Sequence, residues 1–143
     1  MRPDFDRYFR DYAELYNKAL TDHPDYEAIM DRFTKCFIAA GPKGVECGES
    51  GAEFLATLEK GYAFYKQIGT KRMSVRHVQA TEIDGTHHIA RVYYHAEYVK
   101  DDKPIAIDFD VTYVLENSTG KPKIFAFISG DEMALYKKYG LVA

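Results

Sequence analysis

The 143-residue sequence contains no tryptophan, only two cysteines and no excess of basic residues. Its 19 Lys and Arg residues are outnumbered by 22 Asp and Glu residues, which gives a formal net charge of −3. Nucleic acid binding depends on basic side chains that displace counterions from phosphates, so nucleic acid is not an expected partner. The two cysteines, Cys36 and Cys47, are too few for a disulfide framework, which indicates a reducing compartment.

Long apolar runs are also missing. No stretch approaches the roughly 20 apolar residues that a membrane span needs, and the segment 1–6 has no apolar signal core. We therefore expect a cytoplasmic protein with no membrane partner. Cys36 and Cys47 lack the paired spacing of a zinc site, and the glycines around Gly41 lack the ending of a phosphate loop, so we expect no metal and no cofactor.

Tyrosine is abundant instead, with 12 Tyr and 9 Phe in a chain of this length. A tyrosine brings apolar area and a hydroxyl that needs a partner when it is buried. Two interpretations stay open at this point, a tyrosine-rich core and a pocket that binds a ring-shaped organic molecule. The length and the even composition predict a single domain over residues 1–143.

Helical periodicity runs through the first half of the chain. Apolar residues recur at spacings of three and four over residues 5–20 and 54–68, which predicts two amphipathic helices. Pro24 can open a short helix between them. Residues 36–39 are predicted as a short strand, and the glycine-rich stretch 41–51 as a loop.

Helix ends are marked by capping residues. Ser50 and Glu53 form a capping box before the third helix, and Gly69 stands where a C-terminal glycine cap belongs. Asp131 can cap a last short helix that ends near Tyr139. The chain is therefore expected to begin with three helices and to close with a short C-terminal one.

After Gly69 the apolar residues recur at every second position instead of every third or fourth, which predicts β-structure. Turn signals at Asp84-Gly85, at Asp101-Asp102 and near Asn117 separate the predicted strands. These strands are residues 72–83, 86–100, 104–115 and 122–129. Three helices followed by an antiparallel meander indicate an α+β fold, in which a strongly curved sheet wraps around the helices and leaves a tapered cavity.

The turn at Asp101-Asp102 fixes a register for the two middle strands. If it is a two-residue turn, His95 lies opposite Asp108 and Tyr93 lies opposite Asp110, so one face is polar and the other apolar. The apolar face can meet the helices, which leaves the polar face in solvent. Alternatively, the polar face lines the cavity and the apolar face is buried in a homodimer joined through the sheet, which would gather carboxylates and a histidine for acid–base chemistry.

Two groups of residues resemble a known superfamily. Residues 11–15 (Asp-Tyr-Ala-Glu-Leu) and 27–29 are similar to the first two helical segments of ketosteroid isomerase. Residues 110–113 and 120–129 resemble the DV–strand–DGKI–strand ending of the same family. Together with the element order, they resemble the nuclear-transport-factor-2-like superfamily, whose α+β fold is cone-shaped and whose members include ketosteroid isomerase and the SnoaL-like cyclases.

The resemblance implies roles for particular residues. Tyr12 matches the oxyanion-hole tyrosine of the isomerase, and Asp110 matches the protonated aspartic acid that shares this oxyanion, so both are expected in one cavity. The aspartate base of the isomerase precedes a proline, where this chain has Gly41-Pro42. A replacement base is therefore expected among His95, Asp108, Glu97 and His77.

The expected function follows from this resemblance, and the expected site combines Tyr12 and Asp110 with the polar face of the predicted sheet. The function implied is small-molecule binding, with cofactor-independent isomerase, cyclase, dehydratase or hydrolase activity on an apolar ring compound. The alternative is a non-catalytic ligand-binding or dimerisation module, and the orientation of Asp110 distinguishes the two. The candidate catalytic residues are Tyr12, Asp110, His95 and Asp108, and the candidate ligand contacts are Tyr93, Arg91, Glu97 and Tyr62.

Overall fold

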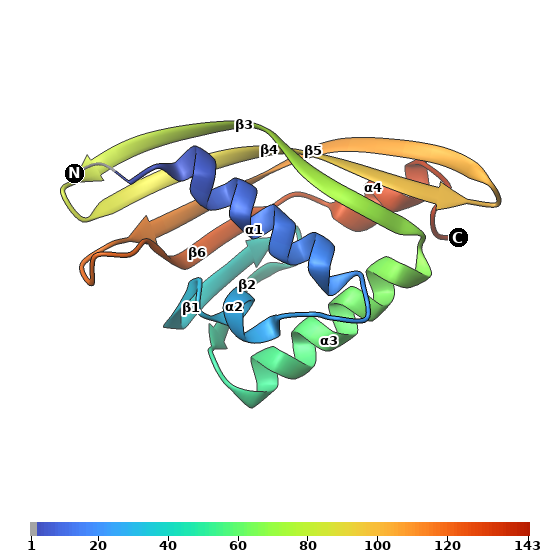
Figure 1. Ribbon diagram of the computed structural model, residues 1–143. Helices are drawn as coiled ribbons and strands as arrows, with labels where there is room; N and C mark the ends of the chain where they lie inside the picture. The colour runs from blue at the N-terminus through green and yellow to red at the C-terminus, as the bar shows by residue number, and fades with distance from the viewer. Residues whose placement is uncertain (1–2) are drawn as a thin grey trace.

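A computed structural model describes residues 3–143. Residues 1 and 2, which belong to the segment 1–6 that has no apolar signal core, lie outside the described residues. Figure 1 shows a long, curved sheet whose concave side faces α1 and α3, with α4 near the C-terminal end. None of the helices in residues 3–143 is long and apolar enough to cross a membrane. The helices are α1 (Phe5–Ala19), α2 (Tyr26–Met30), α3 (Ala52–Gln67) and α4 (Glu132–Lys138), and the strands are β1 (Phe33–Gly41), β2 (Gly44–Glu49), β3 (Thr70–Asp84), β4 (His87–Lys100), β5 (Lys103–Glu116) and β6 (Lys123–Ser129).

The α+β prediction is confirmed, with helices at the N-terminus packed on a sheet and a short helix at the C-terminus. The strand order is β2-β1-β6-β5-β4-β3, and β3 to β6 form the predicted antiparallel meander. The sheet is nevertheless mixed, because β1 pairs with β6 in parallel. This parallel pair brings the β1–β2 hairpin next to the start of α4, which is where the site described below opens.

The predicted register of β4 and β5 is confirmed. His95 pairs with Asp108 and Tyr93 pairs with Asp110. The turn between the strands consists of Asp101 and Asp102, whose φ angles are 51° and 63°. Positive φ at both central residues matches the twist of a two-residue hairpin, and aspartate tolerates this conformation better than most residues.

The apolar face of this sheet meets the helices. Val92 and Tyr94 on β4 and Val111 and Tyr113 on β5 are all buried, and they belong to the same core as Phe9 of α1. The first of the two open alternatives is therefore right, and the inverted sheet is wrong. The reason is that α1 offers an apolar stripe of matching width, so the sheet buries its own apolar face without a second copy of the chain.

Two local predictions are wrong. The stretch expected as a loop over 41–51 contains β2, which pairs with β1 in an antiparallel hairpin. Ser50 does not cap α3, because the N-cap residue is Gly51 and no side chain caps that end. The backbone N–H of Ser50 instead donates to the Lys35 carbonyl oxygen at 2.8 Å and so extends the hairpin. The predicted cap at Asp131 is confirmed, since its carboxylate accepts from the Ala134 N–H at 2.9 Å.

Candidate functional site

A cavity of about 290 Å³ lies between the inner face of the sheet and helices α1 and α3, and we call it the inner cavity. It continues into a wider pocket of about 650 Å³, the outer pocket, between α3, the β1–β2 hairpin and α4. Seven tyrosines and four phenylalanines of the described chain line the inner cavity. They are Tyr12, Tyr16, Tyr62, Tyr65, Tyr94, Tyr113 and Tyr136, together with Phe33, Phe54, Phe109 and Phe127.

Gly61 keeps the passage between the two spaces open. It lies within α3 and lines both the inner cavity and the outer pocket. Apart from its chain neighbours and the backbone of its own helix, no atom stands within 4 Å of the place where a Cβ atom would project from it. Glycine is otherwise a poor residue in the middle of a helix, since it costs roughly 1 kcal/mol relative to alanine. The missing side chain therefore leaves space at the position where the cavity opens.

The tyrosines that line the inner cavity differ in how their hydroxyls are bonded. Tyr94 and Tyr113 share a hydrogen bond of 2.8 Å between their hydroxyl oxygens. Four further tyrosines line this cavity without a hydrogen bond from their hydroxyls to residues 3–143, and burial raises the pKa of each of them. They are neutral phenols at physiological pH and can donate to a bound molecule. These residues are Tyr12, Tyr16, Tyr62 and Tyr65.

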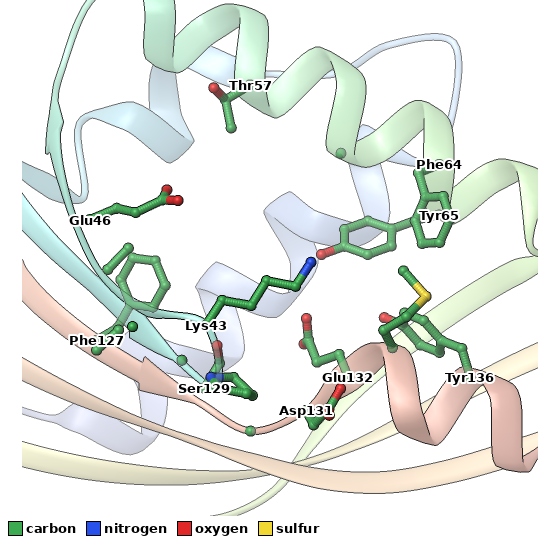
Figure 2. A pocket seen from close by; sticks show the side chains of 18 of the residues that line it. Lys43, Glu46, Thr57, Phe64, Tyr65, Phe127, Ser129, Asp131, Glu132 and Tyr136 are labelled. Atoms are coloured by element: carbon green, nitrogen blue, oxygen red, sulfur yellow. The ribbon is translucent and has the colours of Figure 1, made fainter.

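Glu132 is the only residue with a formal charge among the described residues that line the inner cavity. It stands in the first turn of α4, and its carboxylate forms no hydrogen bond or ion pair with any part of residues 3–143. Burial raises the pKa of this carboxyl group. Figure 2 shows its carboxylate directed into the pocket, on the side where the Tyr65 hydroxyl and the Lys43 ammonium also point. A carboxyl group held in this way is suited to exchanging protons with a ligand.

Of the predicted site residues, Tyr12 and Tyr62 line the inner cavity. Asp110 does not. It lies on the opposite face of β5, where its Oδ2 accepts from Arg91 Nε at 3.0 Å, and its side chain is 39% exposed. The expectation that Tyr12 and Asp110 share one cavity is therefore wrong. Strand alternation explains this, because the neighbours Phe109 and Val111 take the inward positions.

The other polar candidates gather on the outer face with Asp110. His95 Nδ1 lies 2.7 Å from Asp108 Oδ1, and Glu97 Oε1 is 3.8 Å from His95 Nε2. The Arg91 guanidinium lies over the ring of Tyr93, 5.1 Å from its centroid. The structure brings these residues together as predicted, but none of them lines the inner cavity. Their expected place in a cavity site is corrected to a solvent-facing network of ion pairs.

The sequence analysis missed Glu132, Tyr65 and the hairpin residue Lys43. An acidic residue in a first helical turn is normally explained by the helix dipole, so Glu132 gave no separate signal. One signal was present, because Glu132 precedes Tyr136 by four residues and so shares its inward face. Gly41 and its neighbour Pro42, which stand where the isomerase carries its base, line the outer pocket. The pocket carboxylate thus comes from α4 instead of β1.

No group of three or more His, Cys, Asp or Glu side chains within residues 3–143 is arranged to hold a metal ion. The polar chemistry of the cavity in the described chain therefore consists of phenol hydroxyls, the hydroxyl of Thr57 and the carboxyl of Glu132. This set can donate hydrogen bonds to an oxygen or nitrogen of a ligand and can move a proton at one point of the wall.

Comparisons with known proteins agree with the cone-shaped fold. A family model described as "NTF2-like protein (DUF6841)" matches residues 3–132. No curated protein matches.

Solved structures resemble the chain over most of its length. An NTF2-like protein with a cystatin-like fold from Novosphingobium aromaticivorans has a TM-score of 0.70 at 10% identity, with 98% of this chain and 87% of that chain covered. A ketosteroid isomerase-like protein from Erwinia carotovora atroseptica has a TM-score of 0.56 at 12% identity, covering 86% and 91%. The association domain of C. elegans CaMKII has a TM-score of 0.60 at 12% identity, covering 85% and 91%. At these identities the likeness shows the fold alone.

Proposed function

Since the chain belongs to the NTF2-like family DUF6841, we propose that it is a small-molecule-binding protein that holds a compact, largely apolar ring compound in the inner cavity. The observation that carries this proposal is an aromatic cavity of about 290 Å³, lined by tyrosines whose hydroxyls are available to a ligand. These hydroxyls are free to donate a hydrogen bond to a polar substituent of a ligand. Aromatic walls with a few convergent polar groups are typical of small-molecule sites.

The same wall supports acid–base chemistry of the isomerase, cyclase, dehydratase or hydrolase kind without a cofactor. Glu132 is the proton acceptor in this proposal, because its carboxyl borders both the inner cavity and the outer pocket. Tyr65 and Tyr12 are neutral phenols that can donate to a developing oxyanion. In this proposal Glu132 takes the role of base that the sequence analysis expected of His95, Asp108, Glu97 or His77.

Filling the passage at Gly61 tests the binding proposal. The variant Gly61→Leu places an apolar side chain in the open space between the two pockets, and the matched control Gly61→Ala adds only a methyl group. Both variants should fold, because leucine and alanine favour helix over glycine. Isothermal titration calorimetry with the neutral probe 2-naphthol should show binding by wild type and by Gly61→Ala, and a loss of at least about tenfold in affinity by Gly61→Leu.

Two results would contradict the proposal. One is a wild-type protein that takes up no naphthol at millimolar probe concentration. The other is equal affinity in wild type and Gly61→Leu, which would place the bound probe outside the inner cavity.

A second candidate function is a non-catalytic association module joined through the outer face of the sheet. It is favoured by exposed apolar residues at one end of that face, since Val45, Ile128 and Ile38 are 68%, 55% and 44% exposed. The pairings of Ala40 with both Val45 and Ile128 place them on the same side of the sheet. The CaMKII neighbour is an association domain by name.

Light scattering after size exclusion tests this second function. A homodimer should become a monomer in Val45→Glu, because a charge in a buried apolar interface is strongly unfavourable. The control Lys35→Glu changes a charge on the neighbouring strand and should leave the mass unchanged. A monomeric wild type at micromolar concentration would remove the association function and leave the ligand-binding function untouched.

A further inference from the structure

The charge distribution around the cavity selects among ligands. Within the described chain, the inner cavity presents the carboxyl of Glu132 and no Lys, Arg or His side chain. The outer pocket carries both signs, with Lys43 and Lys60 offset by Glu46 and Asp131. The rim is therefore balanced, and the charge that a ligand meets inside the cavity is the one on Glu132.

The carboxylate of Glu132 forms no ion pair within residues 3–143, although Lys43 and Lys60 line the outer pocket with it. Phenols line the cavity with it, and burial first, then the charge of Glu132, raises the pKa of Tyr65 and of Tyr136. A partly buried carboxylate without a paired cation favours a cationic group beside it on the wall of the cavity.

The aromatic wall complements a positive charge as well. The rings of Tyr16, Tyr62 and Tyr65 contact one another. The ring centroids of Tyr16 and Tyr62 are 5.2 Å apart, those of Tyr62 and Tyr65 are 5.6 Å apart, and those of Tyr16 and Tyr65 are 5.4 Å apart. Aromatic faces attract ammonium groups through their quadrupoles, and this attraction grows where water is excluded. An anionic ligand would instead meet the like charge of Glu132.

We propose that the ligand of the inner cavity is an organic cation, a one- or two-ring compound whose protonated amine or quaternary ammonium group lies beside Glu132. The proposal rests on the proposed function, because it specifies the ligand of the same cavity. The volume of about 290 Å³ lies at the small end of ligand sites, which restricts the ring system to this size. The ring lies among the tyrosines, and the charged group lies at the junction with the outer pocket.

Three probes of one shape separate this inference from the proposed function. They are 1-naphthylmethylammonium, 1-naphthalenemethanol and 1-naphthoate, which carry a positive, a neutral and a negative substituent on the same ring. Calorimetric titration of the wild-type protein should show the cation binding at least about tenfold tighter than the alcohol, and the carboxylate binding weakest.

Charge-removing variants then locate the preference. Glu132→Gln keeps the size of the side chain and should abolish the preference, so that the cation and the alcohol bind this variant with equal affinity. Glu46→Gln removes a carboxylate from the outer pocket and should keep the preference.

Three other outcomes of the titrations would contradict parts of the proposal. Equal affinity for the three probes would overturn the cation inference and leave the ligand-binding function standing. A preference for the cation that survives in Glu132→Gln would overturn the role of Glu132. Failure of all three probes to bind would overturn both the inference and the proposed function.

Discussion

The side chain of Asn17 is hydrogen-bonded at both ends to the backbone of Met73. Asn17 Nδ2 donates to the Met73 carbonyl oxygen at 2.9 Å, and the Met73 N–H donates to Asn17 Oδ1 at 2.7 Å. Met73 lies on β3, an edge strand of the sheet, and Asn17 lies near the end of α1. The amide therefore takes the place of a neighbouring strand, anchors the helix and occupies groups that another chain could pair with.

Replacing Asn17 should uncouple this helix from the sheet edge. In Asn17→Ala both backbone groups of Met73 lose their partner, so the free energy of unfolding should fall by about 1–3 kcal/mol. Urea denaturation of the variant measures this loss. The control Lys18→Ala changes the next, exposed residue and should stay within about 0.5 kcal/mol of wild type. Equal stability of the two variants would show that water replaces the amide without cost.

Gly69 should tolerate no side chain. Its φ is 91°, and a Cβ atom there would overlap the carbonyl oxygen of Val99, whose N–H donates to Gly69 O at 2.9 Å. Gly120 has a φ of 92° with no atom within 4 Å of a Cβ, so it shares the strain without the overlap. We expect Gly120→Ala to lose about 1–2 kcal/mol of stability and Gly69→Ala to lose at least about 1 kcal/mol more. Thermal denaturation that ranks the two variants equally would argue against a rigid contact with Val99.

The hydroxyl pair of Tyr94 and Tyr113 should behave as a unit. Removing one hydroxyl, in Tyr94→Phe or Tyr113→Phe, leaves the other buried oxygen without its partner, so each should cost about 1–2 kcal/mol. The double variant should cost less than the sum of the two, with a coupling free energy of about 0.5–1.5 kcal/mol. Urea denaturation of the four proteins gives this coupling. Strict additivity would mean that the two hydroxyls do not depend on each other.

Glu132 should make stability depend on pH in a defined direction. Burial raises the pKa of Glu132 above its ordinary value of 4.5. The folded protein therefore holds this proton more tightly than the unfolded chain does, so its contribution to stability is present below about pH 4.5 and is lost as pH rises toward the folded pKa. Glu132→Gln has no such loss, and its melting temperature should exceed that of wild type by more at about pH 7.5 than at about pH 4.

The exposed Glu53, in the first turn of α3, serves as the control for this measurement. Glu53→Gln removes a carboxylate that stays in water and should show no comparable gain at the higher pH. A melting-temperature difference for Glu132→Gln that is the same at both pH values would show that its carboxyl is as well solvated in the folded protein as in the unfolded chain. A gain of stability together with a loss of cation binding would be a trade of stability for function.

The sequence by itself determined the features that depend on near neighbours. Apolar spacing located α1 and α3, and Asp101-Asp102 specified a two-residue turn from which the pairing of His95 with Asp108 followed by counting. These features follow from short-range rules, because helix periodicity, turn chemistry and strand alternation act over a few residues. Tyr12, which the resemblance nominated, and Tyr62 both line the cavity.

Only the tertiary structure decided which face of the sheet is inside and which carboxyl reaches the cavity. Asp110 and Glu132 are both acidic residues near apolar ones, yet alternation turns Asp110 outward to Arg91, and the packing of α4 turns Glu132 inward. The strand β2 was missed for a related reason, since Gly44–Glu49 pairs with β1 although its composition resembles a loop. Burial is a relation between elements distant in sequence, so local pattern alone did not assign it.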